Sequence, residues 1–255
     1  NLAIGYDALG GAVAGGEGNI AIGNYSLDAN TSGDYNTALG YASLGANTNN
    51  SHNTALGWQS LLNTASGGFN TGVGSRSLES NASGINNTAV GVNSIFTNSS
   101  GDENTGVGRN SLYLTTGSYN TSLGWYSGNE ITSGTYNTVI GHNASASGAT
   151  AVNQTVIGAG VTGKGDNTVT IGDGSVTVWY PTDDNEVDLG SSSVEFKNVY
   201  IDGVTYTDAV GFGTVVMTLP TADGSDGQIL KTDGSGVLAW VNNSGVAGAI
   251  DDLSD

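Results

Sequence analysis

The chain repeats a five-residue motif, asparagine–Thr/Ile/Leu–any residue–aliphatic–glycine, at a nearly constant interval. The motif reads NTALG at residues 36–40 and again at residues 53–57, which is 17 positions later. Nine copies begin at Asn1, Asn19, Asn36, Asn53, Asn70, Asn87, Asn104, Asn120 and Asn137, and two degraded copies follow, up to Gly172. A period of 17 residues is too short for a helix pair or a propeller blade, but it suits two short strands and two turns, which make one coil of a β-solenoid.

We therefore expect an all-β fold in which residues 1–172 form a parallel β-solenoid (β-roll) of about ten 17-residue coils. Strands of neighbouring coils would stack about 4.8 Å apart, so ten coils would make a rod about 50 Å long. The repeat is longer between Gly5 and Gly23 and shorter near Gly117. These length changes should fall in turns, where they are tolerated.

Each repeated position has a physical reason in such a coil. Asparagine side chains in one column can form a hydrogen-bonded ladder, and glycine accepts the positive φ of a turn. The ladder residues expected on this basis are Asn36, Asn53, Asn70, Asn87 and Asn104, with Gly40, Gly57, Gly74, Gly91 and Gly108. Leu39 and Leu44 are expected to supply the apolar interior, and Thr37 has the β-branched shape that suits a strand.

One chain has little apolar material for its own core. Each coil offers two large aliphatic side chains, worth about 1.5–3 kcal/mol each on burial, against a backbone entropy cost of about 1–2 kcal/mol per residue. Strand alternation also places Asn36 and Ala38 on one face of the strand and Thr37 and Leu39 on the other. If one face fills the coil, the other needs a partner, so we expect identical chains to pack along a common axis.

The repeats NTALGYASL (36–44), NTAVGVNSI (87–95) and NTVIGHNAS (137–145) resemble the head repeats of trimeric autotransporter adhesins. In that family short asparagine-to-glycine coils build a left-handed parallel β-roll within a trimer, and bacteriophage tail-fibre and other virion proteins carry repeats of the same kind. The resemblance covers residues 1–172 and implies that the coils are packed or intertwined as a homotrimer.

The remainder of the chain favours the phage alternative. Residues 188–203 (DLGSSSVEFKNVYIDG) and 219–240 resemble segments of phage tail fibres, and no sustained heptad pattern suggests the stalk of an adhesin. We expect three parts: the solenoid at 1–172, a β-rich fibre module at 173–218 and a hairpin-type module at 219–255. Strands are expected at 176–180, 195–201 and 213–219, and both ends of the sequence look like cuts in a longer fibre.

Composition limits the partners. The formal net charge is −18, from 23 acidic and 5 basic residues, and such a chain repels phosphate backbones, so we expect no nucleic-acid binding. No apolar run reaches the length of about 18 residues that marks a membrane span, so no membrane insertion is expected. The chain contains no cysteine, which excludes disulfides and thiolate metal sites.

The sequence offers little catalytic chemistry. His52 and His142 occupy different phases of the repeat and are expected to be solvated, and no phosphate-binding loop is present. The acidic cluster at residues 183–188 is the best metal candidate, but a solvated, charge-rich turn is the favoured interpretation. We expect no enzymatic activity, no metal and no cofactor.

The position after the repeat glycine varies freely, as expected of a surface column. Tyr41, Trp58, Trp125 and Tyr126 could stack on sugar rings of a host glycan or contact a receptor, although packing between chains is the favoured interpretation. We therefore expect a structural trimeric fibre segment of a phage tail or virion, located in the virion or at an extracellular surface. It would act as a rigid spacer with other fibre or virion proteins and could serve in host attachment. The alternatives are an adhesin head, a polysaccharide-degrading tailspike with paired carboxylates, and a monomeric globular binding protein.

Overall fold

Each repeat forms one strand, three residues long, directly after its asparagine (or Gln154 and Thr168 in the last copies). The computed structural model describes residues 1–11, 16–176, 209–212, 215–218, 220, 224–235 and 237–242, and within these ranges all regular structure is β. The repeat strands are β1 (Leu2–Ile4), β2 (Ile20–Ile22), β3 (Thr37–Leu39), β4 (Thr54–Leu56), β5 (Thr71–Val73), β7 (Thr88–Val90), β9 (Thr105–Val107), β10 (Thr121–Leu123), β11 (Thr138–Ile140), β12 (Thr155–Ile157) and β13 (Val169–Ile171).

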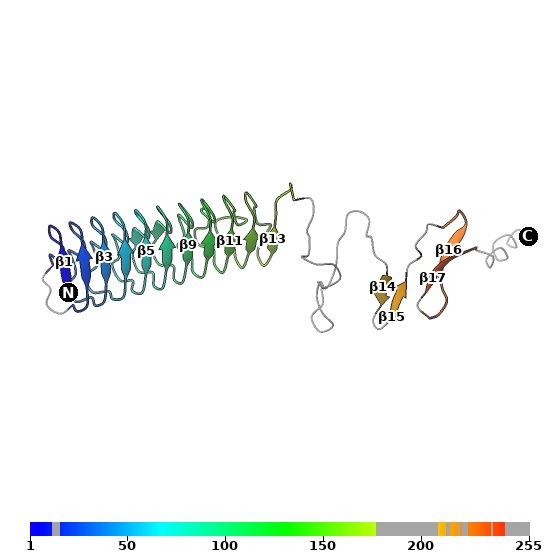
Figure 1. The fold of residues 1–255 in the computed structure, drawn as a ribbon, viewed down its shortest axis with the longest axis horizontal. Helices are drawn as coiled ribbons and strands as arrows, with labels where there is room; N and C mark the ends of the chain where they lie inside the picture. The colour runs from blue at the N-terminus through cyan, green and yellow to red at the C-terminus, as the bar shows by residue number, and fades with distance from the viewer. Residues whose placement is uncertain are drawn as a thin grey trace, which may run out of the picture. The chain divides into compact units, whose positions relative to one another are not determined.

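These strands form one 11-stranded parallel sheet in chain order (Figure 1). Equivalent residues pair across coils: Thr37 lies beside Thr54, Ala38 beside Ala55 and Leu39 beside Leu56. The predicted parallel β-solenoid with coils about 17 residues apart is therefore confirmed. Contacts divide the chain into two units, Asn1–Tyr180, which holds the solenoid, and Pro181–Asp255.

The prediction of two strands per coil is wrong for most coils. Among the described residues of the solenoid, a second strand occurs only at β6 (Ser80–Asn81) and β8 (Thr97–Asn98), which pair in parallel. In coils with and without a second strand, the chain after the glycine enters the left-handed region, with φ of 51° at Leu44 and 50° at Leu78. This segment still bonds to the next coil, since the Leu44 N–H donates to the Ser60 carbonyl at 3.0 Å.

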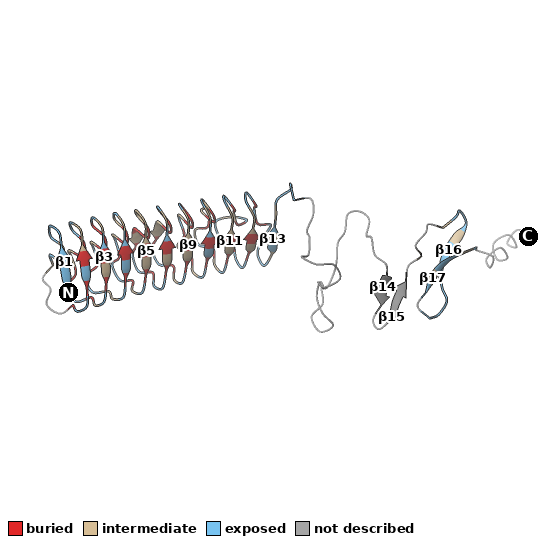
Figure 2. Ribbon diagram, viewed as in Figure 1, coloured by how far each residue is buried: buried red, intermediate tan, exposed pale blue. Residues whose placement is uncertain are grey.

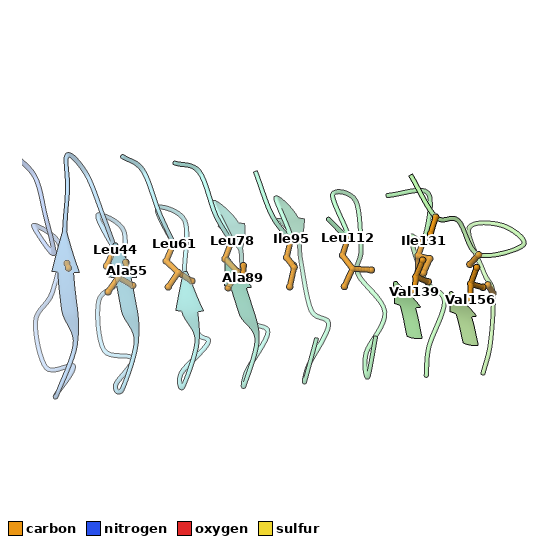
Figure 3. Close-up of a cluster of buried hydrophobic side chains, with 14 of the residues drawn as sticks. Leu44, Ala55, Leu61, Leu78, Ala89, Ile95, Leu112, Ile131, Val139 and Val156 are labelled. Carbon is orange, nitrogen blue, oxygen red and sulfur yellow. The ribbon is translucent and has the colours of Figure 1, made fainter. Parts of the chain in front are cut away.

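The interior is built from the Ala38 and Leu44 positions rather than from Leu39. Ala38, Leu44 and their equivalents from the coil of β2 to that of β10 are buried and form a continuous row along the solenoid (Figures 2 and 3). Leu39 is 41% exposed, so its predicted place in the core is wrong. The reason is strand alternation: Asn36 and Ala38 point inward, which turns Thr37 and Leu39 outward.

The ladder asparagines are buried and bond each coil to its neighbour. The Asn53 N–H donates to Asn36 Oδ1 at 2.9 Å, and Asn36 Nδ2 donates to the Asn50 carbonyl at 2.8 Å. The first of these bonds recurs between successive coils from Asn1 to Gln154, at 2.8–3.2 Å. One side chain therefore satisfies a backbone donor of the next coil and a backbone carbonyl of a turn.

The repeat glycines meet two requirements at once. Gly74 has a φ of 132°, and a Cβ added there would lie 2.6 Å from the Gly91 carbonyl oxygen in the next coil. The left-handed conformation disfavours any other residue, and the close stacking of coils leaves no room for a side chain. The glycine column is thus a consequence of the coil spacing.

A second buried polar column was not anticipated from the sequence. It comprises Asn30, Asn47, Thr64, Asn81, Asn98 and Thr115. Amides link within it where two asparagines adjoin, as where Asn98 Nδ2 donates to Asn81 Oδ1 at 2.8 Å. Thr64 interrupts the column, and in the described chain the buried Asn47 Oδ1 has no hydrogen-bond partner.

One coil shows how the core tolerates a shorter repeat. The missing residue falls in the turn between Thr115 and Gly117, as predicted. In the next coil Gly128, with a φ of 60°, takes the place of the buried leucine, and the fully buried Ile131 takes the place of the second polar column. The apolar side chain has moved three positions along the coil, so the interior stays filled. The longer repeat includes residues 12–15, which lie outside the described residues.

The second unit contributes two antiparallel pairs. β14 (Ala209–Phe212) pairs with β15 (Val215–Thr218), and β16 (Gln228–Thr232) pairs with β17 (Leu238–Asn242). β15 lies within the strand predicted at 213–219, and β16–β17 is a hairpin in the region predicted to hold one. The strand at 195–201 and nearly all of that at 176–180 lie outside the described residues, and the three-part division remains a prediction.

Restoring the second polar column should stabilise the solenoid. In Thr64→Asn the new amide can donate to Asn47 Oδ1 and accept from Asn81 Nδ2, so we expect a gain of about 1 kcal/mol in the free energy of unfolding. Urea unfolding measures this, with Thr48→Asn at an exposed turn as the control. If Thr64→Asn is no more stable than the control, the unpaired Asn47 Oδ1 does not lower the free energy of unfolding.

Candidate interaction surface

The outer face of the parallel sheet carries an unbroken column of aliphatic side chains, here called the aliphatic ladder. Its members are Ile4, Ile22, Leu39, Leu56, Val73, Val90, Val107, Leu123, Ile140, Ile157 and Ile171. Leu56 is 42% exposed and Leu123 is 48% exposed. The column of Thr37 and its equivalents runs beside it on the same face. An apolar stripe of this length is unusual on a soluble protein and marks a contact surface.

Two further columns border this face, one before and one after each strand. The N-flank column is the residue before each ladder position: Gly18, Tyr35, His52, Phe69, Asn86, Glu103, Tyr119, Tyr136 and Asn153. The C-flank column is the residue after each repeat glycine from β2 to β12: Asn24, Tyr41, Trp58, Ser75, Val92, Arg109, Trp125, His142 and Ala159. Most of these side chains are exposed.

Aromatic rings stack along the N-flank column. His52 lies between Tyr35 and Phe69, with ring centroids 5.2 and 4.8 Å apart, and Tyr119 stacks on Tyr136 at 4.7 Å. In a stack, the faces of the rings contact each other and only the ring edges are exposed to solvent. A sugar ring that binds by stacking needs a free aromatic face, so these runs suit packing between proteins better than glycan binding.

The predicted contact residues fall into separate groups. Tyr41 and Trp58 occupy adjacent coils of the C-flank column, whereas Trp125 lies four coils further along. Tyr126 is half-buried and belongs to the next position of the repeat. The structure therefore does not bring the four predicted residues together at one site.

Of these four residues, Trp58 alone has a ring without an aromatic neighbour in the described chain. Tyr41 meets the edge of Tyr25 at 5.7 Å, and Trp125 contacts Tyr126 at 4.5 Å and His142 at 4.8 Å. Trp58 is also 47% exposed, which makes it the best-placed residue for stacking on a ligand.

Charge near this surface is sparse. Arg76 forms an ion pair with Glu79 and lies 4.6 Å from the centre of the Phe96 ring. The hydrogen bond to Glu79 raises the pKa of Arg76, and burial raises the pKa of Glu130, which accepts hydrogen bonds from Ser145 and Ala146. The Arg76–Glu79 pair lies within one coil, whereas the contacts of Arg76 with Phe96 and of Glu130 with Ser145 join neighbouring coils, and these groups do not converge on one cleft.

The two histidines and the acidic metal candidate are the other sites considered from the sequence. His52 and His142 are exposed, and each stacks on an aromatic ring. No group of three or more His, Asp or Glu side chains suited to a metal ion occurs among the described residues. The acidic cluster at 183–188 lies outside them.

Comparison of the chain with protein-family models, with curated proteins and with solved structures finds no match. No helix able to cross a membrane occurs in the part of the chain that the structure describes. The surface must therefore be interpreted from its own geometry.

The N-flank column was missed at the sequence level although its signal was present. Aligning the repeats on their asparagines places Tyr35, His52 and Phe69 in one column, and Tyr119 and Tyr136 in the same column further on. Parallel in-register stacking then predicts ring contacts at about the coil spacing.

Proposed function

We propose that this chain is a segment of a homotrimeric, non-enzymatic fibre of a phage tail or virion, where it acts as a rigid spacer and contributes to attachment at a host surface. The observation that carries the proposal is the aliphatic ladder, which runs across all eleven strands of the sheet and whose side chains are exposed or half-buried. Burying one such side chain is worth about 1.5–3 kcal/mol. A face that repeats this gain in every coil favours association along the whole solenoid.

A second copy of the chain is the partner that fits best. A second copy presents the same aliphatic ladder with the same coil spacing, so the side chains of one copy can pack between those of the other along the full length of the solenoid. Closed cyclic assemblies of identical chains are also the commonest oligomers. The number three comes from the resemblance to adhesin heads and fibre proteins.

The hairpin of the second unit gives independent support for association. Ile229 and Leu230 are adjacent in β16, so they point to opposite faces, yet they are 45% and 43% exposed. Val237 is 48% exposed. A two-stranded hairpin with apolar groups on both faces is marginal by itself, and neighbouring copies of the same hairpin would cover it.

Stiffness suits a spacer. Asparagine bonds, backbone bonds and stacked glycines connect every coil to the next, so bending would break several contacts in each coil. Within this proposal the partners are other copies, further fibre or virion proteins, and a host-surface glycan or protein.

A charge on the sheet face should dissociate the assembly. In Leu56→Asp a carboxylate would enter the buried interface, where an unpaired charge is strongly unfavourable, so the trimer is expected to become monomeric. Sedimentation equilibrium measures the mass, with Ala46→Asp at an exposed turn as the control. Circular dichroism checks that the β-structure persists. A wild-type chain that sediments as a monomer would contradict the proposal.

The location of the fibre needs a separate test. Antibodies against residues 1–172 should decorate fibres on assembled virions in electron micrographs. Decoration of a bacterial cell surface instead would favour the adhesin-head alternative. Shortening of host polysaccharide by the purified chain would replace the spacer with a tailspike enzyme.

A further inference from the structure

The two flank columns carry their aromatic rings and their charged residues in the same coils. Where the N-flank residue is aromatic, the C-flank residue of the same coil is usually aromatic or histidine, as in the coils of β3, β4, β10 and β11. Where the N-flank residue is Gly18, Asn86 or Asn153, the C-flank residue is likewise not aromatic, being Asn24, Val92 or Ala159. Phe69 with Ser75 is the aromatic residue without an aromatic counterpart in its coil.

Contacts within one chain do not explain this match. The flank residues of one coil are separated by the strand, about 20 Å along an extended backbone of six residues. No ring contact joins the two columns in the described chain. Stacking along each column explains why aromatic residues cluster in runs, but not why both runs occupy the same coils.

Contacts between copies do explain it. When copies surround an axis parallel to the solenoid, the N-flank border of one sheet face meets the C-flank border of the next face at the same height. We infer that the copies pack in exact axial register, with the N-flank column of each chain against the C-flank column of its neighbour. This inference rests on the proposed parallel homo-oligomer and adds its register and its contact pairs.

One coil supplies a charged pair that fixes the register. Glu103 and Arg109 flank β9, and they are the charged members of the two columns from β2 to β12. Both side chains are exposed, and neither forms an ion pair or a side-chain hydrogen bond in the described chain. In register, Glu103 of one copy meets Arg109 of the next.

Other arrangements lose this complementarity. A shift by one coil would place Glu103 opposite Val92 or Trp125, and it would place Arg109 opposite Asn86 or Tyr119. An antiparallel pair of solenoids would reverse the order of coils and separate the aromatic runs from their matches. The parallel, in-register arrangement satisfies the charges and the aromatic runs together.

Chemical cross-linking tests the register, because the chain has no cysteine of its own. The double variant Glu103→Cys/Arg109→Cys is treated with a dimaleimide shorter than two coil spacings, about 10 Å. Denaturing gels should then show covalent oligomers up to the full assembly. The control Glu103→Cys/Tyr41→Cys places the thiols four coils apart, about 19 Å along the axis, and should give at most trace cross-linking.

The untreated variants are also sedimented, which separates two kinds of failure. Assemblies that do not cross-link at 103 and 109, or that cross-link equally in the control, would overturn the register while leaving the fibre intact. Monomeric variants beside a monomeric wild-type chain would overturn both. Cross-linking of the single variant Glu103→Cys to itself would show that like columns meet and would overturn the inference.

Charge reversal gives a second readout that keeps the backbone unchanged. Glu103→Arg and Arg109→Glu should each lower the dissociation midpoint of the assembly, because like charges would face each other, and the double exchange should restore it. Equal effects of the single and double exchanges would contradict a direct pair.

Discussion

The structure depends on one hydrogen bond, from the backbone N–H of each ladder residue to the Oδ1 of the asparagine one coil earlier. Because the donor is backbone and the acceptor is a side chain inside the coil, the bond fixes both the spacing of the coils and the inward direction of the asparagine. A buried donor without this partner would cost about 1–3 kcal/mol. Each coil therefore requires one inward asparagine. The glycine that follows is required because the next coil lies too close to leave room for a side chain.

The inward asparagine also determines the surface. Alternation along a three-residue strand sends the middle residue inward and the threonine and aliphatic residues outward. The same bond that stabilises the interior thus leaves an apolar column on the outside of every coil. A solenoid of this type satisfies the hydrogen bonds of its asparagine ladder within one chain but does not complete its apolar burial, which is the physical reason to propose a fibre of several chains.

The sequence predicted the solenoid, its coil spacing and its turns well, because exact repetition constrains all of them at once. It failed at Leu39, since two aliphatic positions were assigned to the core although the inward Asn36 and Ala38 leave room only for Leu44. It also predicted a second strand in each coil, whereas the described coils form one only at β6 and β8. The candidate surface was predicted only in part: Tyr41 and Trp58 lie on it, but the stacked N-flank rings emerge only when coils are placed in register.

Amide hydrogen exchange of the native protein tests the central hydrogen bond most directly. The N–H groups of ladder residues such as Asn53, Asn70 and Asn87 should exchange slowly, because each is buried and bonded to the preceding coil. The N–H groups of exposed turn residues such as Asn49 and Ser100 should exchange quickly. Ladder amides that exchange as fast as these turn amides would contradict the stacking of coils through their asparagines.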